Sequence, residues 1–160
     1  IEYLSSTAHA PESPPILLAP LIRSAYWVPS RVGMALADPV VEYLPRRNVK
    51  VSHDSSFRAL RKNDPLNSGR FPLQWGRAFF AWHERIRATA RLDLSPVIIQ
   101  GTADDVVDWR YNLRFFRAKT TGPAIHLIDG ARHHLHNESP RYRERVMDVI
   151  RRRLQDLKMD

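Results

Sequence analysis

Three short apolar runs constrain the fold of this chain more than any other feature of its sequence. They lie at residues 16–19, 97–99 and 124–128, and each is bounded by proline or glycine. None of the three alternates apolar with polar residues. Short continuous runs of this kind are typical of strands buried on both faces of a sheet. The sequence therefore predicts a core of at least three strands.

Helical patterns follow the second and third runs. Asp108 is suited to cap the first of these helices, because apolar residues recur at helical spacing directly after it. Ser139 and Pro140 suit the cap and first turn of the second helix. One face of that second helix is expected to hold Tyr142, Val146, Val149, Ile150, Leu154 and Leu157. Strand, helix, strand, helix in this order predicts an α/β fold with a parallel sheet.

Residues 23–94 do not follow this rhythm, since they are rich in arginine and aromatic residues and read as mostly helical. Trp75, Phe79, Trp82 and Ile86 form an apolar stripe at helical spacing, which is typical of a core and also compatible with a binding face. The chain therefore divides into a connector with the first core strand (1–22), an inserted segment (23–94) and a C-terminal core (95–160).

Composition narrows the classes of partner. The net charge of +8 comes from 21 Arg and 4 Lys spread along the chain, with no nucleic-acid recognition motif beside the basic clusters. We expect no nucleic-acid partner, although basic charge can steer anionic substrates or support peripheral membrane contact.

The absence of cysteine excludes disulfides and thiolate metal sites. The longest apolar runs are too short to cross a bilayer. The location in the cell is left open, with the cytoplasm favoured.

Polar segments follow the second and third predicted strands, at residues 100–108 and 129–138. Functional groups of open parallel sheets gather beyond the carboxyl ends of the strands. The candidate acids are Asp104, Asp105 and Asp108, and the candidate histidines are His133, His134 and His136. A turn aspartate and a histidine-rich metal site are the alternatives, but no further ligand falls at metal-binding spacing. An acid after one strand and a histidine after the next is the chain order of a hydrolase triad.

These two segments carry a resemblance to a known family. Residues 96–104 and 130–138 resemble the acid and histidine segments of α/β-hydrolases, closest to the monoacylglycerol lipase and lysophospholipase-like serine hydrolases. Residues 16–20 resemble the strand after the nucleophile helix of that branch, and residues 64–66 a short motif of its cap. The resemblance implies the C-terminal half of an α/β-hydrolase fold with a mostly helical cap insertion. It also implies a small-molecule ester or lipid substrate and no cofactor or metal.

The resemblance assigns roles to individual residues. It implies Asp104 as the triad acid and His133 as the base, with Asp105 and His134 as their rivals. Asp108 is expected to act as a helix cap, and His136 and Glu138 to support the loop. The aromatic side chains implied to contact the substrate are Trp27, Trp75, Phe79 and Trp82.

The nucleophile of this family does not match any segment of the chain. No Gly-x-Ser-x-Gly pentapeptide occurs, and Ser5 and Ser6 lack the flanking glycines. We expect the N-terminal half of the same fold to supply the serine and the oxyanion hole, completing a carboxylic-ester hydrolase, and this chain alone to be inactive. The open alternatives are a catalytically incomplete interaction module, an Asp-nucleophile hydrolase of the dehalogenase or epoxide hydrolase type, and a nucleic-acid binder suggested by charge alone.

Overall fold

The computed structural model describes residues 13–37, 41–46 and 49–157. Most of the predicted connector, including Ser5 and Ser6, lies outside the described residues.

The core of the described structure is a parallel sheet of strands β1 (Ile16–Leu18), β4 (Val97–Gly101) and β5 (Ala124–Ile128), in the order β1-β4-β5. Each predicted apolar run is therefore a strand. Only β4 is buried along its whole length, because it alone has a neighbouring strand on both sides among the described residues. β1 is half-buried and β5 is largely exposed, so the expectation of full burial holds for the central strand only.

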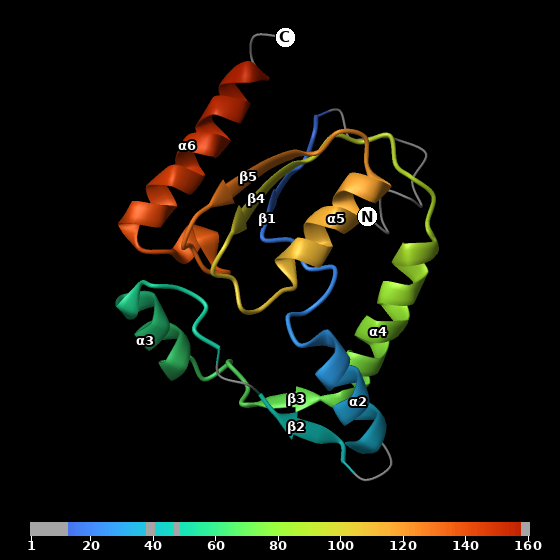
Figure 1. Cartoon of the computed structure of the whole chain (residues 1–160). Coiled ribbons are helices and arrows are strands. Elements are labelled where there is room, and N and C mark those ends of the chain that lie inside the picture. Colours follow the sequence, from blue (N-terminus) through green and yellow to red (C-terminus); the bar gives the residue numbers. More distant parts are fainter. Residues whose placement is uncertain (1–12, 38–40, 47–48, 158–160) are drawn as a thin grey trace.

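One helix covers each face of the sheet (Figure 1). Helix α6 (Pro140–Asp156) packs Val146 against Val97 and Ile99 on one face. Helix α5 (Trp109–Lys119) belongs to the cluster that contains Ile98 on the other face. Successive residues of a strand point to opposite faces, so β4 contributes to both halves of the core.

The predicted helix caps have different outcomes. The Asp108 side chain caps α5 by accepting a hydrogen bond from the Tyr111 amide. Ser139 occupies the cap position of α6 but makes no capping hydrogen bond with its side chain. Its own amide donates to the Glu138 carboxylate instead, at 3.0 Å. The predicted apolar face of α6 ends early, since Leu154 is 49% exposed.

Most of the regular secondary structure between β1 and β4 is helical, as predicted. The segment contains α2 (Trp27–Ala37), α3 (Ser55–Asn63) and α4 (Leu73–Ala88). It also contains an antiparallel pair, β2 (Tyr43–Pro45) with β3 (Arg70–Pro72), which was not predicted. Strands of three residues are too short to display a period of two in the sequence.

Helices α2 and α4 lie with the β2–β3 pair at one end of the molecule, whereas α3 lies near the start of α6 (Figure 1). The apolar stripe of α4 runs from solvent into the core. Ile86 is fully buried against the sheet, whereas Trp75 is 68% exposed. Within the described parts of the chain, no helix combines the length and apolar character needed to cross a bilayer.

Candidate active site

The loops that follow β4 and β5 meet at the carboxyl edge of the sheet. The Ala103 amide donates to the Ala131 carbonyl at 3.0 Å, and the Gly130 amide donates to the Thr102 hydroxyl at 2.8 Å. A Cβ atom on Gly101 would lie 2.3 Å from the Ala131 carbonyl oxygen. Only glycine therefore allows the two loops to approach this closely.

Asp104 and His133 are brought together by this approach. His133 Nδ1 lies 2.9 Å from Asp104 Oδ2, across 29 residues of sequence. The Asp104 carboxylate also accepts hydrogen bonds from the amides of Val106 and Val107, at 2.8 and 3.2 Å, and from Gln100 Nε2 at 3.0 Å. Four donors hold the carboxylate in one orientation.

The ionisation of Asp104 decides the tautomer of its partner. Burial alone would raise the pKa of Asp104, but hydrogen bonds from His133, Val106 and Gln100, together with the charge of His133, hold it below its usual value. An ionised carboxylate only accepts hydrogen bonds, so His133 Nδ1 carries the proton. The other ring nitrogen, Nε2, is then free to accept one.

His134, the rival base, has different surroundings. Its amide donates to the Val51 carbonyl, and its ring lies 5.3 Å from the ring of Phe57 and 5.5 Å from that of His133. Its buried Nδ1 has no hydrogen-bond partner among the described residues. Burial, with the nearby charges of His133 and Arg61, lowers the pKa of His134 to about 4. It is therefore a neutral, packed ring with no carboxylate to orient it.

The rival acids are engaged elsewhere. Asp105 is largely exposed and pairs with Arg132 at 3.0 Å. Asp108 caps α5 and lies 3.5 Å from Arg23 Nε. The structure brings Asp104 to His133, and it brings neither rival there.

Glu138 fastens the histidine loop to the segment that precedes α3. Its carboxylate is fully buried and accepts hydrogen bonds from the amides of Arg132, His53 and Ser139, at 2.7, 2.9 and 3.0 Å. Its Oε1 also lies 3.1 Å from His53 Nδ1. Burial alone would raise the pKa of Glu138, but the hydrogen bonds from these amides and from the His53 side chain lower it below its usual value.

Sequence reasoning missed Gln100 and His53 as parts of this site. Gln100 could have been noticed, because it is a polar side chain at the end of an apolar strand and is fully buried. Nothing in the sequence signals His53, which lies 85 residues before its partner Glu138.

Two of the four aromatic candidates line an apolar pocket of about 690 Å³ between α2, α4 and the β2–β3 pair. These are Trp75 and Phe79. Val106, whose amide donates to Asp104, also lines it. Trp27, the third of these candidates, is 5% exposed and packs against the ring of Phe79. Trp82 lies against the buried cluster between α4 and α5 rather than in the pocket.

Within the part of the chain that the structure describes, no three His, Asp or Glu side chains come close enough to hold a metal ion.

Residues 4–140 match the family described as serine aminopeptidase, S33. No curated protein matches the sequence.

Among solved structures, the chain is similar to the monoacylglycerol lipase of Paleococcus ferrophilus, with a TM-score of 0.69 and 18% identity over 88% of this chain and 58% of that one. A soluble variant of the Saccharomyces cerevisiae monoglyceride lipase, bound to a substrate analogue, matches with a TM-score of 0.74 and 18% identity. The match covers 97% of this chain and 60% of that one. DcsB, in complex with its substrate analogue, matches with a TM-score of 0.57 and 13% identity. The match covers 88% of this chain and 55% of that one. The chain thus spans less than two thirds of the length of each of these structures. At these identities the likeness concerns the fold.

Proposed function

The chain belongs to the serine aminopeptidase S33 family of hydrolases, and from that premise we propose that it supplies the acid and histidine of a carboxylic-ester hydrolase. The observation that carries the proposal is the hydrogen bond between His133 Nδ1 and the buried Asp104 carboxylate. The serine and the oxyanion hole would come from the N-terminal half of the fold, because the 160 residues contain no Gly-x-Ser-x-Gly turn. This chain alone would then be inactive.

His133 would act first as a base and then as an acid. Its Nε2 takes the serine proton as the hydroxyl oxygen attacks the ester carbonyl, and the imidazolium then gives that proton to the departing alkoxide. The alcohol leaves and the acyl group stays on the serine. Water, deprotonated by the same nitrogen, then attacks the acyl carbonyl. The bond to the serine oxygen breaks, the imidazolium returns its proton to that oxygen, and the carboxylic acid is released. Asp104 stays ionised throughout and stabilises the imidazolium.

The inserted segment, residues 23–94, would serve as the cap over this site. Its apolar pocket is lined by Trp75 and Phe79 and touches Val106, next to the triad acid. A cavity of about 690 Å³ has the size of known ligand sites. An acyl chain fits its apolar lining, and the lipases named among the similar structures support a lipid-type ester. Trp27 and Trp82 would support the pocket wall from behind.

Ester turnover by the chain together with its N-terminal half tests the proposal. We expect hydrolysis of p-nitrophenyl esters, trapping of an acyl-enzyme on a serine detected by mass spectrometry, and loss of both in His133→Ala. Halide release from haloalkanes, with no ester turnover, would instead indicate an Asp-nucleophile hydrolase. Absence of any turnover would favour an interaction module.

A further inference from the structure

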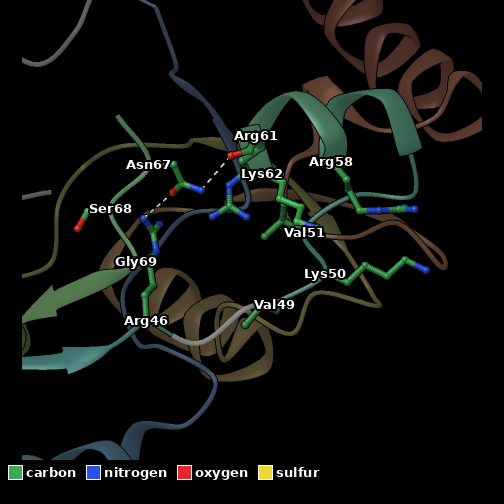
Figure 2. Close-up of a pocket in the computed structure, with 10 residues that line it drawn as sticks. All are labelled: Arg46, Val49, Lys50, Val51, Arg58, Arg61, Lys62, Asn67, Ser68 and Gly69. Carbon is green, nitrogen blue, oxygen red and sulfur yellow. Dashed lines mark hydrogen bonds between the residues drawn. The ribbon is translucent and has the colours of Figure 1, made fainter. Parts of the chain in front are cut away.

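A second pocket, of about 560 Å³, lies beside α3 and is lined by basic side chains (Figure 2). The five are Arg46, Lys50, Arg58, Arg61 and Lys62. No aspartate or glutamate lines this pocket, and within the described residues no carboxylate forms an ion pair with any of the five. In Figure 2 the charged ends of Lys50 and Arg58 extend away from that of Arg46, so the five line the pocket without meeting at one point. Like charges around one pocket repel one another, and a bound anion would reduce that repulsion.

Hydrogen bonds to neutral groups fix the positions of two of these arginines. Arg46 Nη1 donates to Asn67 Oδ1 at 3.0 Å, and Asn67 Nδ2 donates to the Arg61 carbonyl at 2.9 Å (Figure 2). Arg58 Nη1 donates to the carbonyls of Ser52 and His53, at 3.1 and 2.9 Å. These acceptors orient the guanidinium groups without neutralising their charge.

The pocket adjoins the loop that carries His133. The carbonyl of Val51, which lines the pocket, accepts the amide of His134, and the carbonyl of Lys50 accepts Arg132 Nη1 at 2.9 Å. Burial is the main cause of the lowered pKa of His134, but the charge of Arg61 contributes to it. The positive potential of the pocket therefore reaches the histidine loop.

Arg46 also lines the apolar pocket described above, so the basic and apolar pockets share a wall. Its amide donates to the Gly69 carbonyl at 2.8 Å, which fixes its backbone next to the β2–β3 pair. One pocket touches the loop of His133 and the other touches Val106, beside Asp104. A molecule that occupied both pockets would lie beside residues that hydrogen-bond to the histidine loop and to Asp104.

We propose that the basic pocket binds the phosphate of an anionic ester whose acyl chain occupies the adjoining apolar pocket. The inference rests on the proposed ester hydrolysis and names the charge of its substrate. A phosphate offers several acceptor oxygens, and charge-assisted hydrogen bonds from arginine and lysine are about twice as strong as neutral ones. Neutral esters of the same chain length would lack this contribution.

The test compares a 1-acylglycerol 3-phosphate with the 1-acylglycerol of the same acyl chain, using the chain together with its N-terminal half. We expect a higher kcat/KM for the phosphate ester. Each of Arg61→Gln and Lys62→Gln should lower the ratio of the two kcat/KM values about 10-fold, because a hydrogen bond to a charged group is lost. Arg117→Gln, an equal loss of charge at an exposed position of α5, should leave the ratio unchanged. Added salt should reduce the preference.

Binding of inorganic phosphate, measured by titration calorimetry against chloride at equal ionic strength, separates the outcomes. If phosphate binds to the parent and not to Arg61→Gln while neither ester is cleaved, the anion site stands and the proposed hydrolysis fails. Equal turnover of the two esters, unaffected by Arg61→Gln, would overturn the inference and leave the hydrolysis intact. If phosphate binds but gives the ester no advantage, the pocket holds a free anion and the assignment to the substrate is wrong.

Discussion

The loops beyond β4 and β5 and the inserted segment contribute to the site in opposite ways. Asp104 accepts four hydrogen bonds and Glu138 at least four, and both carboxylates are buried. The inserted segment instead presents two open pockets lined by partly exposed side chains such as Trp75 and Arg61. The proposed acid and histidine loops are fixed by many mutually supporting contacts, whereas the pocket side chains proposed to bind the substrate are nearly independent of one another. Substitutions in the first region should therefore disable catalysis or stability outright, and those in the second should alter selectivity.

The largest effect should come from the reacting pair. His133→Ala should lower kcat about 10⁴- to 10⁶-fold, because it removes the base that takes the serine proton in the proposed mechanism, and Asp104→Asn somewhat less. Steady-state ester hydrolysis by the complete protein measures both. His134→Ala and Asp105→Asn are the matched controls and should be mild. An inactive His134→Ala beside an active His133→Ala would show that the base is the neighbouring histidine.

Glu138 tests whether the loop needs its clamp. Glu138→Gln places an amide group where the carboxylate accepts three amides, so it should lower the free energy of unfolding by about 3 kcal/mol. Urea denaturation with Glu144→Gln, an exposed position of α6, as control measures this. A change below about 0.5 kcal/mol would contradict a structural role for the clamp.

The pH dependence of stability sharpens the comparison. The pKa of His134 is lowered in the folded protein, to about 4. On acidification this imidazole is therefore protonated at a higher pH in the unfolded chain than in the folded one. Above about pH 6.5 the group is neutral in both states and does not lower the free energy of unfolding. As the pH decreases toward 4, the unfolded chain becomes protonated and the free energy of unfolding falls. After allowance for partial exposure, the loss should be about 2 kcal/mol. His134→Gln cannot titrate, and its stability should change less over the same range. Equal pH profiles for parent and variant would exclude His134 as the source.

The smallest effect belongs to the apolar pocket. Trp75 is 68% exposed yet lines the pocket, so Trp75→Ala should leave the melting temperature nearly unchanged. It should lower kcat/KM for long-chain esters about 10-fold and for acetyl esters much less, since each CH₂ left unburied loses about 0.8 kcal/mol. Phe79→Ala provides the contrast, because Phe79 also packs on Trp27 and Trp82 and its loss should destabilise the fold. Equal losses for all chain lengths in Trp75→Ala would remove it from the binding site.

The sequence predicted the sheet well because its signals are local. A continuous apolar run between prolines or glycines can be read without knowing its neighbours, and so can the cap of α5 at Asp108. The β2–β3 pair was missed because three residues carry no usable period, and because antiparallel pairing over 27 residues is decided by tertiary packing. The exposed end of α6 at Leu154 was missed because helical periodicity does not reveal how far the partner surface extends.

The sequence by itself determined the order of the elements and the pairing of an acid loop with a histidine loop. The resemblance implied Asp104 and His133 and left Asp105 and His134 as rivals, and only the tertiary structure shows physically why the first pair meets. Asp104 and Asp105 are adjacent and chemically identical, as are His133 and His134, so no local preference distinguishes them. Burial and long-range hydrogen bonds do, because Gln100, Val106 and His133 all donate to the same carboxylate. The grouping of five cations around one pocket was likewise invisible in the sequence, since it brings α3 together with residues on both sides of it, from Arg46 to Gly69.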